Sequence, residues 1–262
     1  GVRRVVHPIR IQSQPTCRYG PPASSPEQEH CTVTLTWTLC IVGAYLLGSI
    51  PFGVLIGRAK GIDIRQQGSR NIGATNVGRV LGRPFGYLCF VLDMAKGCIP
   101  VLIAGALAHV IGHNPMELPG GTLWLWMLVA IAALLGHMYS IFLGFKGGKG
   151  VATAFGALVA MWPVLTIPAL CALAVWIVVV ICTRVISLAS MAAALIVPIA
   201  TLISLFIAHG DAEDTVGSTD RFINASAPMT ITLAIAALVL WRHRSNIGRL
   251  IRGEEHVIKS SR

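Results

Sequence analysis

The stretch from Gly68 to Arg79 combines residue types that could hold a phosphate group. It reads Gly-Ser-Arg-Asn-Ile-Gly-Ala-Thr-Asn-Val-Gly-Arg. Glycines let a backbone approach a ligand and turn its N–H groups toward an anion, and arginine can bind phosphate oxygens through two N–H groups. The residues predicted to bind phosphate here are Gly68, Ser69, Asn71, Gly73, Thr75, Asn76 and Arg79. A basic loop that only sets membrane topology is the alternative, and it does not explain the glycines.

A second glycine-rich basic stretch runs from Gly144 to Thr153. It is not a nucleotide P-loop, because Leu143 stands where the first glycine belongs and Gly150 stands where the metal-binding hydroxyl belongs. It predicts a turn that enters a helix at about Val151, whose N-terminus would attract an anion. The predicted binding residues are Lys146, Gly147, Gly148, Lys149 and Gly150. The alternative is a basic anchor at the membrane interface.

A third stretch, Trp241 to Glu255, ends the last apolar segment. His243, Asn246 and Arg249 recur at a spacing of three, so on a helix they share one face and could point at one site. A basic helix that binds anionic lipid is the alternative.

Three further polar residues lie inside apolar segments. Asp93 and Lys96 are one helical turn apart, and charges inside a membrane helix normally face a partner or a polar cavity. Their mutual pairing is one explanation, and a ligand-facing Lys96 is the other. Ser49 precedes the helix-breaking Pro51.

The composition is that of an integral membrane protein. The 262 residues are 54% hydrophobic and only 12% charged, against about 25% charged in soluble domains. The net charge of +10 lies mostly in short loops between apolar runs, which favours a lipid or phosphate partner over nucleic acid.

The apolar runs predict an all-α polytopic helical bundle, most simply with seven transmembrane helices, six being the alternative. The predicted spans are 34–57, 85–111, 122–143, 151–162, 163–183, 185–209 and 226–242. Residues 1–33 are polar and proline-rich, which predicts a disordered tail or a non-native extension. Residues 34–255 would form the membrane domain, and 256–262 a cytoplasmic tail.

Loop charges predict the orientation. The basic loops 58–83, 144–150 and 242–262 fall on one side when seven spans are drawn, and an excess of lysine and arginine marks the cytoplasmic side. The N-terminus would then lie outside and the C-terminus in the cytoplasm. The four arginines of residues 1–33 do not fit this orientation.

Five motifs in order resemble those of the bacterial PlsY family, the acyl-phosphate:glycerol-3-phosphate acyltransferases. They cover about residues 40 to 255 and are Gly48–Gly53, Gly68–Val77, Asp93–Gly97, Phe145–Thr153 and Arg242–Ile247.

This resemblance implies a multi-pass enzyme of the bacterial inner membrane with its active site facing the cytoplasm. It would move the acyl group of acyl phosphate to the 1-hydroxyl of glycerol 3-phosphate and release lysophosphatidic acid and phosphate. The implied partners are these substrates, the lipid bilayer and the soluble enzyme that makes acyl phosphate. No metal or other cofactor is implied.

By the same resemblance, the catalytic residues would be Ser49, Lys96, His243 and Asn246, and Glu255 would be structural. The family's third motif usually closes with Gly-Thr-Glu, whereas this chain has Gly253-Glu254-Glu255. Two rival functions remain. A transporter for an anionic solute would place its binding groups near the bilayer midplane, and a scaffold that binds anionic lipid would not need the glycines.

Overall fold

The computed structural model describes residues 26–119, 121–210 and 218–258, and every regular element among them is a helix. The α-helices are α1 (Pro26–Ser49), α2 (Phe52–Ala59), α3 (Ala74–Leu81), α4 (Arg83–Leu107), α5 (Thr122–Met138), α6 (Val151–Val159), α7 (Thr166–Thr183), α8 (Ile186–Gly210), α9 (Ser218–Arg242) and α10 (Arg244–Ile251). Three 3₁₀-helices join them: η1 (Ile64–Gln66), η2 (Pro115–Glu117) and η3 (Ile141–Leu143).

Six helical segments in the described ranges are long and apolar enough to cross a membrane, which confirms a polytopic helical membrane protein. They are Val33–Ala59, Arg83–Leu107, Thr122–Leu143, Thr166–Thr183, Ile186–Ala208 and Phe222–Arg242. The span predicted over 151–162 contains only α6, of 9 residues, which is short of the roughly 20 residues that a straight crossing needs.

Two predicted boundaries differ from the structure. The first predicted span is two helices, because the chain leaves helical geometry at Ile50 and Pro51 and proline cannot continue the hydrogen bonding of a helix. Helix α1 begins at Pro26, inside the tail predicted over 1–33. Residues 1–25 and 259–262 lie outside the described residues, so the predictions for these ends stay predictions.

Helix α6 lies against α4 at a very short distance. A Cβ atom at Gly97 would meet the carbonyl oxygen of Thr153, and one at Gly156 would meet that of Met94. Glycine at both positions therefore lets the two backbones touch, as small residues do between membrane helices.

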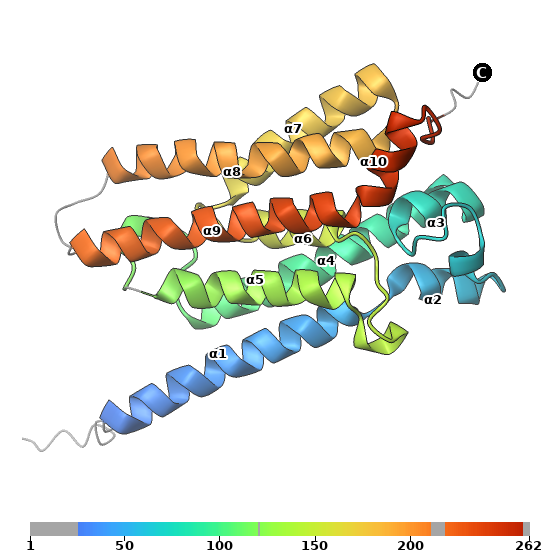
Figure 1. Ribbon diagram of the computed structural model, residues 1–262. Coiled ribbons are helices and arrows are strands. Elements are labelled where there is room, and N and C mark those ends of the chain that lie inside the picture. The colour runs from blue at the N-terminus through green and yellow to red at the C-terminus, as the bar shows by residue number, and fades with distance from the viewer. Residues whose placement is uncertain (1–25, 120, 211–217, 259–262) are drawn as a thin grey trace, which may run out of the picture.

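The polar motifs gather at one end of this bundle. Figure 1 shows α2, α3 and α10 together at the end where α4 begins and α9 ends. The chain beyond α10 returns to the same end, where the N–H of Ile258 donates to the carbonyl of Arg184 at 2.9 Å. At the other end, the N–H of Gly112 donates to the carbonyl of Trp162 at 3.0 Å.

Candidate active site

The loop from Gly68 to Gly73 is organised around the side chain of Asn76. This amide is 1% exposed. Its Nδ2 donates to the carbonyls of Ile64, Gln67 and Asn71 at 3.2, 3.0 and 2.8 Å, and its Oδ1 accepts from the N–H of Ser69 at 2.8 Å. In this structure Asn76 therefore uses its polar atoms to shape the loop.

Asn76→Ala is expected to destabilise the protein by about 3 kcal/mol, because several buried backbone groups lose their partner at once. Asn71→Ala removes a single hydrogen bond, from the N–H of Gly73 at 2.9 Å, so about 1 kcal/mol is expected. Thermal unfolding in detergent and limited proteolysis between Gln66 and Gly73 measure both variants. Equal losses in the two variants would contradict the central role of Asn76.

The remaining predicted residues of this loop are placed differently. Asn71 Oδ1 accepts from Gly73 N–H just before α3, and Thr75 and Arg79 on α3 are exposed. Gly68 has φ +57°, a left-handed conformation that glycine adopts freely.

The second glycine loop packs against the end of α5. The N–H groups of Gly147 and Gly148 donate to the carbonyls of Met138 and His137, each at 3.1 Å. Their own carbonyls accept from the guanidinium of Arg242 at 2.7 and 3.0 Å. A Cβ at either glycine would collide with His137. These glycines are thus required for close packing, and the loop is fixed to both α5 and α9.

A chain of polar contacts links the second and third motifs. Lys149 Nζ donates to Asn246 Oδ1, Asn246 Nδ2 donates to Glu255 Oε1 at 2.8 Å, and Arg249 Nε donates to Glu255 Oε2 at 2.8 Å. Ser187 at the start of α8 also donates to Glu255 Oε1, at 3.1 Å. Burial raises the pKa of Glu255, but hydrogen bonds from Asn246, Arg249 and Ser187 outweigh it and hold this pKa below its usual range.

Positive charge accumulates around Lys149. Burial, together with the charges of Arg249, Arg242 and Arg79, lowers the pKa of Lys149 to about 8 against the opposing effect of Glu255. Since the mutual repulsion of these cations is relieved by an anion placed among them, the cluster Arg79, Lys149, Arg242 and Arg249 is suited to bind phosphate.

His243 lies beside this cluster as a neutral ring. It is 2% exposed, and its Nδ1 lies 2.7 Å from the carbonyl oxygen of Val239, so Nδ1 carries the proton. Burial and the charge of Lys149 lower the pKa of His243 to about 4. The ring is therefore uncharged at neutral pH.

A buried charged network lies deeper, between α1, α4, α5 and α6. Lys96 Nζ lies 2.8 Å from Asp93 Oδ1 and donates to the carbonyl of Ile50 at 2.8 Å. His137 Nδ1 lies 3.7 Å from the same carboxylate oxygen, and Thr153 Oγ1 donates to the carbonyl of Asp93 at 2.9 Å. Lys96 thus ties the break between α1 and α2 to α4.

Ser49 lies at this break and is 1% exposed. Its hydroxyl donates to the carbonyl of Tyr45 at 2.8 Å, and its carbonyl accepts from the hydroxyl of Ser140. The residue before Ser140 is Tyr139, whose ring centre lies 5.6 Å from the guanidinium of Arg242, so the break is connected to the basic cluster through Tyr139 and Ser140.

The structure brings Lys149, His243, Asn246 and Glu255 together as one group, near Arg79. It places Ser49 and Lys96 in the buried network instead, and leaves Lys146, Ser69 and Arg70 exposed. Arg242 was not predicted as a site residue, although it belongs to the third motif. His137 and Thr153 were not among the predicted binding residues either, although Thr153 closes the second glycine-rich stretch.

In the part of the chain that the structure describes, no group of three or more His, Cys, Asp or Glu residues could hold a metal ion. The expectation of a metal-free site stays a prediction.

Comparisons with known proteins bear on this site. The sequence model of the family described as glycerol-3-phosphate acyltransferase matches residues 38–253. A glycerol-3-phosphate acyltransferase of Trichlorobacter lovleyi is 44% identical over 229 residues, which cover 87% of this chain and 100% of the relative. Another, of Aquifex aeolicus, is 41% identical over 216 residues, covering 82% and 96%.

Two solved structures resemble this one closely. They are crystal structures of PlsY, described as an integral membrane glycerol 3-phosphate acyltransferase, in a glycerol 3-phosphate form and a lysophosphatidic acid form. Their TM-scores are 0.68 and 0.66, their identities 39% and 38%, and each comparison covers 86% of this chain and 96% of the other.

Proposed function

This chain belongs to the glycerol-3-phosphate acyltransferase family, and we propose that it transfers the acyl group of an acyl phosphate to the 1-hydroxyl of glycerol 3-phosphate. The products are lysophosphatidic acid and inorganic phosphate, in the first acylation step of phospholipid synthesis.

One observation carries this proposal: Arg79, Arg242, Arg249 and the carboxylate of Glu255 all lie near the half-buried Lys149, at one end of a membrane bundle. Both substrates bring a phosphate group, and both need positive charge to bind close to each other. A site at the membrane end also suits a donor that carries a long acyl chain. A transporter site is expected near the midplane instead.

The acyl group passes directly from donor to acceptor. Acyl phosphate is already an activated anhydride, so alignment of the substrates supplies much of the rate, on the order of 7–11 kcal/mol. A serine nucleophile would need a base within hydrogen-bonding reach, whereas the hydroxyl of Ser49 donates to a backbone carbonyl. Isolation of a protein acylated at Ser49 from a stalled reaction would contradict direct transfer.

The proton of the glycerol hydroxyl is taken by a phosphate oxygen of a substrate. An efficient general base has a pKa near the operating pH. The pKa of His243 is about 4, whereas the second pKa of a phosphate monoester is about 6. The neutral Nε2 of His243 then serves as a hydrogen-bond acceptor that orients the hydroxyl.

The activity is expected to fall above about pH 8, because Lys149 is charged below its pKa of about 8 and neutral above it. The profile of kcat/KM for glycerol 3-phosphate reports this ionisation in the free enzyme. Lys149→Arg keeps the charge to much higher pH, so its alkaline limb should move beyond about pH 9. An unmoved limb in Lys149→Arg would assign this ionisation to another group.

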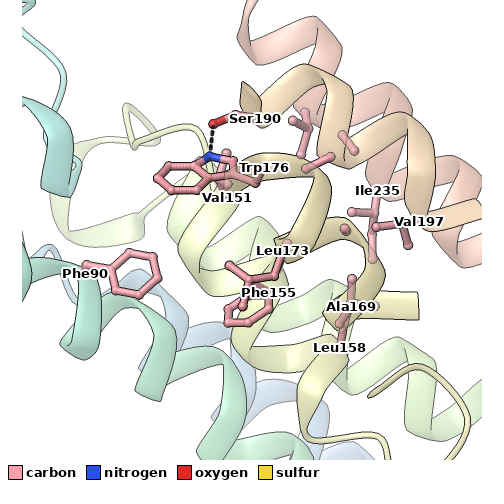
Figure 2. A pocket seen from close by; sticks show the side chains of 15 residues that line it. Phe90, Val151, Phe155, Leu158, Ala169, Leu173, Trp176, Ser190, Val197 and Ile235 are labelled. Atoms are coloured by element: carbon pink, nitrogen blue, oxygen red, sulfur yellow. Dashed lines mark hydrogen bonds between the residues drawn. The ribbon is translucent and has the colours of Figure 1, made fainter. Parts of the chain in front are cut away.

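The acyl chain enters an apolar pocket between α4, α6, α7, α8 and α9. Figure 2 shows Phe90, Phe155 and Trp176 around it. Val151, two residues after Lys149, and Val239, one turn before His243, both line the pocket, so it begins beside the basic cluster. Its room comes from small side chains: Ala154, Ala169, Ala172, Ala193 and Ala194. The indole N–H of Trp176 donates to the hydroxyl of Ser190 at 3.3 Å.

Ala172→Phe is expected to shift the chain-length preference toward shorter donors. The ring would occupy pocket volume, and each methylene that loses its place costs about 1 kcal/mol or more. The ratio of kcat/KM for palmitoyl phosphate to that for decanoyl phosphate should fall about tenfold or more. Ala174→Phe is the matched control, since Ala174 is an exposed residue of α7 that does not line the pocket. If Ala172→Phe and Ala174→Phe have the same kcat/KM ratio, the acyl chain of the donor binds outside this pocket.

The site faces the cytoplasm of a bacterial cell, in its inner membrane, and the chain crosses seven times. The short α6 and residues 160–165 make the additional crossing, which is supported by the hydrogen bond from Gly112 to Trp162 at the end away from the basic cluster. A soluble enzyme delivers the acyl phosphate to the cytoplasmic end.

Donor discrimination tests the proposed reaction. Purified protein is given glycerol 3-phosphate with either palmitoyl phosphate or palmitoyl-CoA, and lysophosphatidic acid is measured. Product from palmitoyl phosphate alone is expected. If lysophosphatidic acid forms from palmitoyl-CoA alone, the donor is an acyl-CoA and not an acyl phosphate, while glycerol 3-phosphate remains the acceptor.

A further inference from the structure

Helix α10 has two faces with different surroundings. One face carries Asn246, which is 4% exposed and bonds Lys149 and Glu255. The opposite face carries Arg244, Ile247 and Ile251, at helical spacings of three and four. Ile251 is 82% exposed and Ile247 is 37% exposed. Both isoleucines are among the exposed large apolar side chains of the described residues.

The exposed face continues onto the end of α9. Trp241 is 59% exposed, and the Arg244 guanidinium lies 4.8 Å from the centre of its ring and donates to its carbonyl at 3.2 Å. The apolar span of α9 ends at Arg242, so Trp241 lies at the boundary between hydrocarbon and water. Figure 1 shows α10 leaving α9 there at a steep angle, so the helix does not continue along the membrane normal.

The chemistry of this surface fits the headgroup region of a bilayer that contains anionic lipid. Tryptophan is enriched at that depth, exposed isoleucines enter the acyl boundary, and arginine beside the membrane attracts anionic headgroups. Free phosphate would not account for the isoleucines.

The two faces belong to one short helix, so contacts on one face affect the position of the other. A helix of 8 residues is not stable alone in water, so its contacts decide its position. Asn246 reaches Lys149 only while α10 lies against the bundle.

We propose that Trp241, Arg244, Ile247 and Ile251 form a lipid face that binds anionic phospholipid, and that this binding holds Asn246 against Lys149. Anionic phospholipid therefore raises the activity of the proposed acyltransferase, which makes the enzyme responsive to the lipid class whose synthesis it begins.

The test compares the full chain in nanodiscs of phosphatidylcholine alone with nanodiscs in which phosphatidylglycerol replaces part of it. Brominated phosphatidylglycerol should quench tryptophan fluorescence more than brominated phosphatidylcholine does, and Trp241→Phe should remove that difference. Phosphatidylglycerol should raise turnover several-fold.

The double variant Arg244→Gln/Ile251→Ser is expected to lose both responses, with a relative affinity for phosphatidylglycerol at least about fivefold lower. Arg58→Gln is the control, because it removes an exposed charge from α2 at the same end of the bundle and should keep both responses. The proposal is overturned if the double variant keeps both, or if Arg58→Gln loses as much. The quenching measurement does not depend on enzymatic activity. If the parent protein is inactive with either lipid, the proposed function fails, but quenching still tests whether the lipid face binds phosphatidylglycerol.

Discussion

Lys149→Ala is expected to lower kcat/KM for glycerol 3-phosphate by about 10²–10³-fold, the range seen when one charged or polar group that stabilises a reacting centre is removed. Lys149 lies among Arg79, Arg242 and Arg249 and is oriented by Asn246. Its loss removes a cation from the proposed phosphate site. Steady-state kinetics in detergent, with thermal unfolding to confirm folding, measure this effect.

Lys146→Ala is the matched control for this prediction. Lys146 lies three residues earlier in the same basic loop, but it is exposed. Loss of its charge should cost less than about fivefold in kcat/KM, the size of a single exposed charge near a membrane surface. Equal losses of kcat/KM in the two variants would mean that the loop acts through its net charge. They would contradict a specific role for the position of Lys149.

Lys96→Met is expected to destabilise the protein by about 3–5 kcal/mol, because it leaves the buried carboxylate of Asp93 without its ion-pair partner. Both side chains of this pair are nearly inaccessible, at 1% and 4%. The melting temperature should fall on the order of 10 °C. Activity would fall as well, since Lys96 also holds the carbonyl of Ile50 next to Ser49.

The double variant Asp93→Asn/Lys96→Met separates two roles for Lys96. If Lys96 is a positioning residue, removal of the orphaned charge should restore much of the lost melting temperature. An unchanged melting temperature in Lys96→Met, together with complete loss of turnover, would instead mean that Lys96 contacts substrate, as the family resemblance implied.

The membrane helices were predictable because a long apolar run inside a bilayer satisfies its backbone hydrogen bonds by forming a helix. The exceptions have local causes. Pro51 divides the first predicted span into α1 and α2, and α6 ends at Val159, after only 9 residues. Hydropathy averages over such a break and does not show where a helix ends. It also does not show that Gly97 and Gly156 bring the backbones of α4 and α6 together.

The site was predictable as a set of motifs, but less so residue by residue. The spacing of His243 and Asn246 predicted that they share one face, and in the structure both lie near Lys149. Motif patterns also gave Asn76, Gly147 and Gly148 a binding role, whereas the side chain of Asn76 and the N–H groups of Gly147 and Gly148 are bonded to backbone groups in this structure. A sequence shows which donors exist. It does not show which of them the fold itself uses.

Release of inorganic phosphate from palmitoyl phosphate by the purified protein, with and without glycerol 3-phosphate, tests the central claim most directly. We predict that phosphate release depends on glycerol 3-phosphate and that one lysophosphatidic acid forms for each phosphate released. In Lys149→Ala, the rate should be at least about 10²-fold lower than in the parent. Release that is independent of glycerol 3-phosphate, or equal in parent and Lys149→Ala, would contradict acyl transfer at this basic cluster.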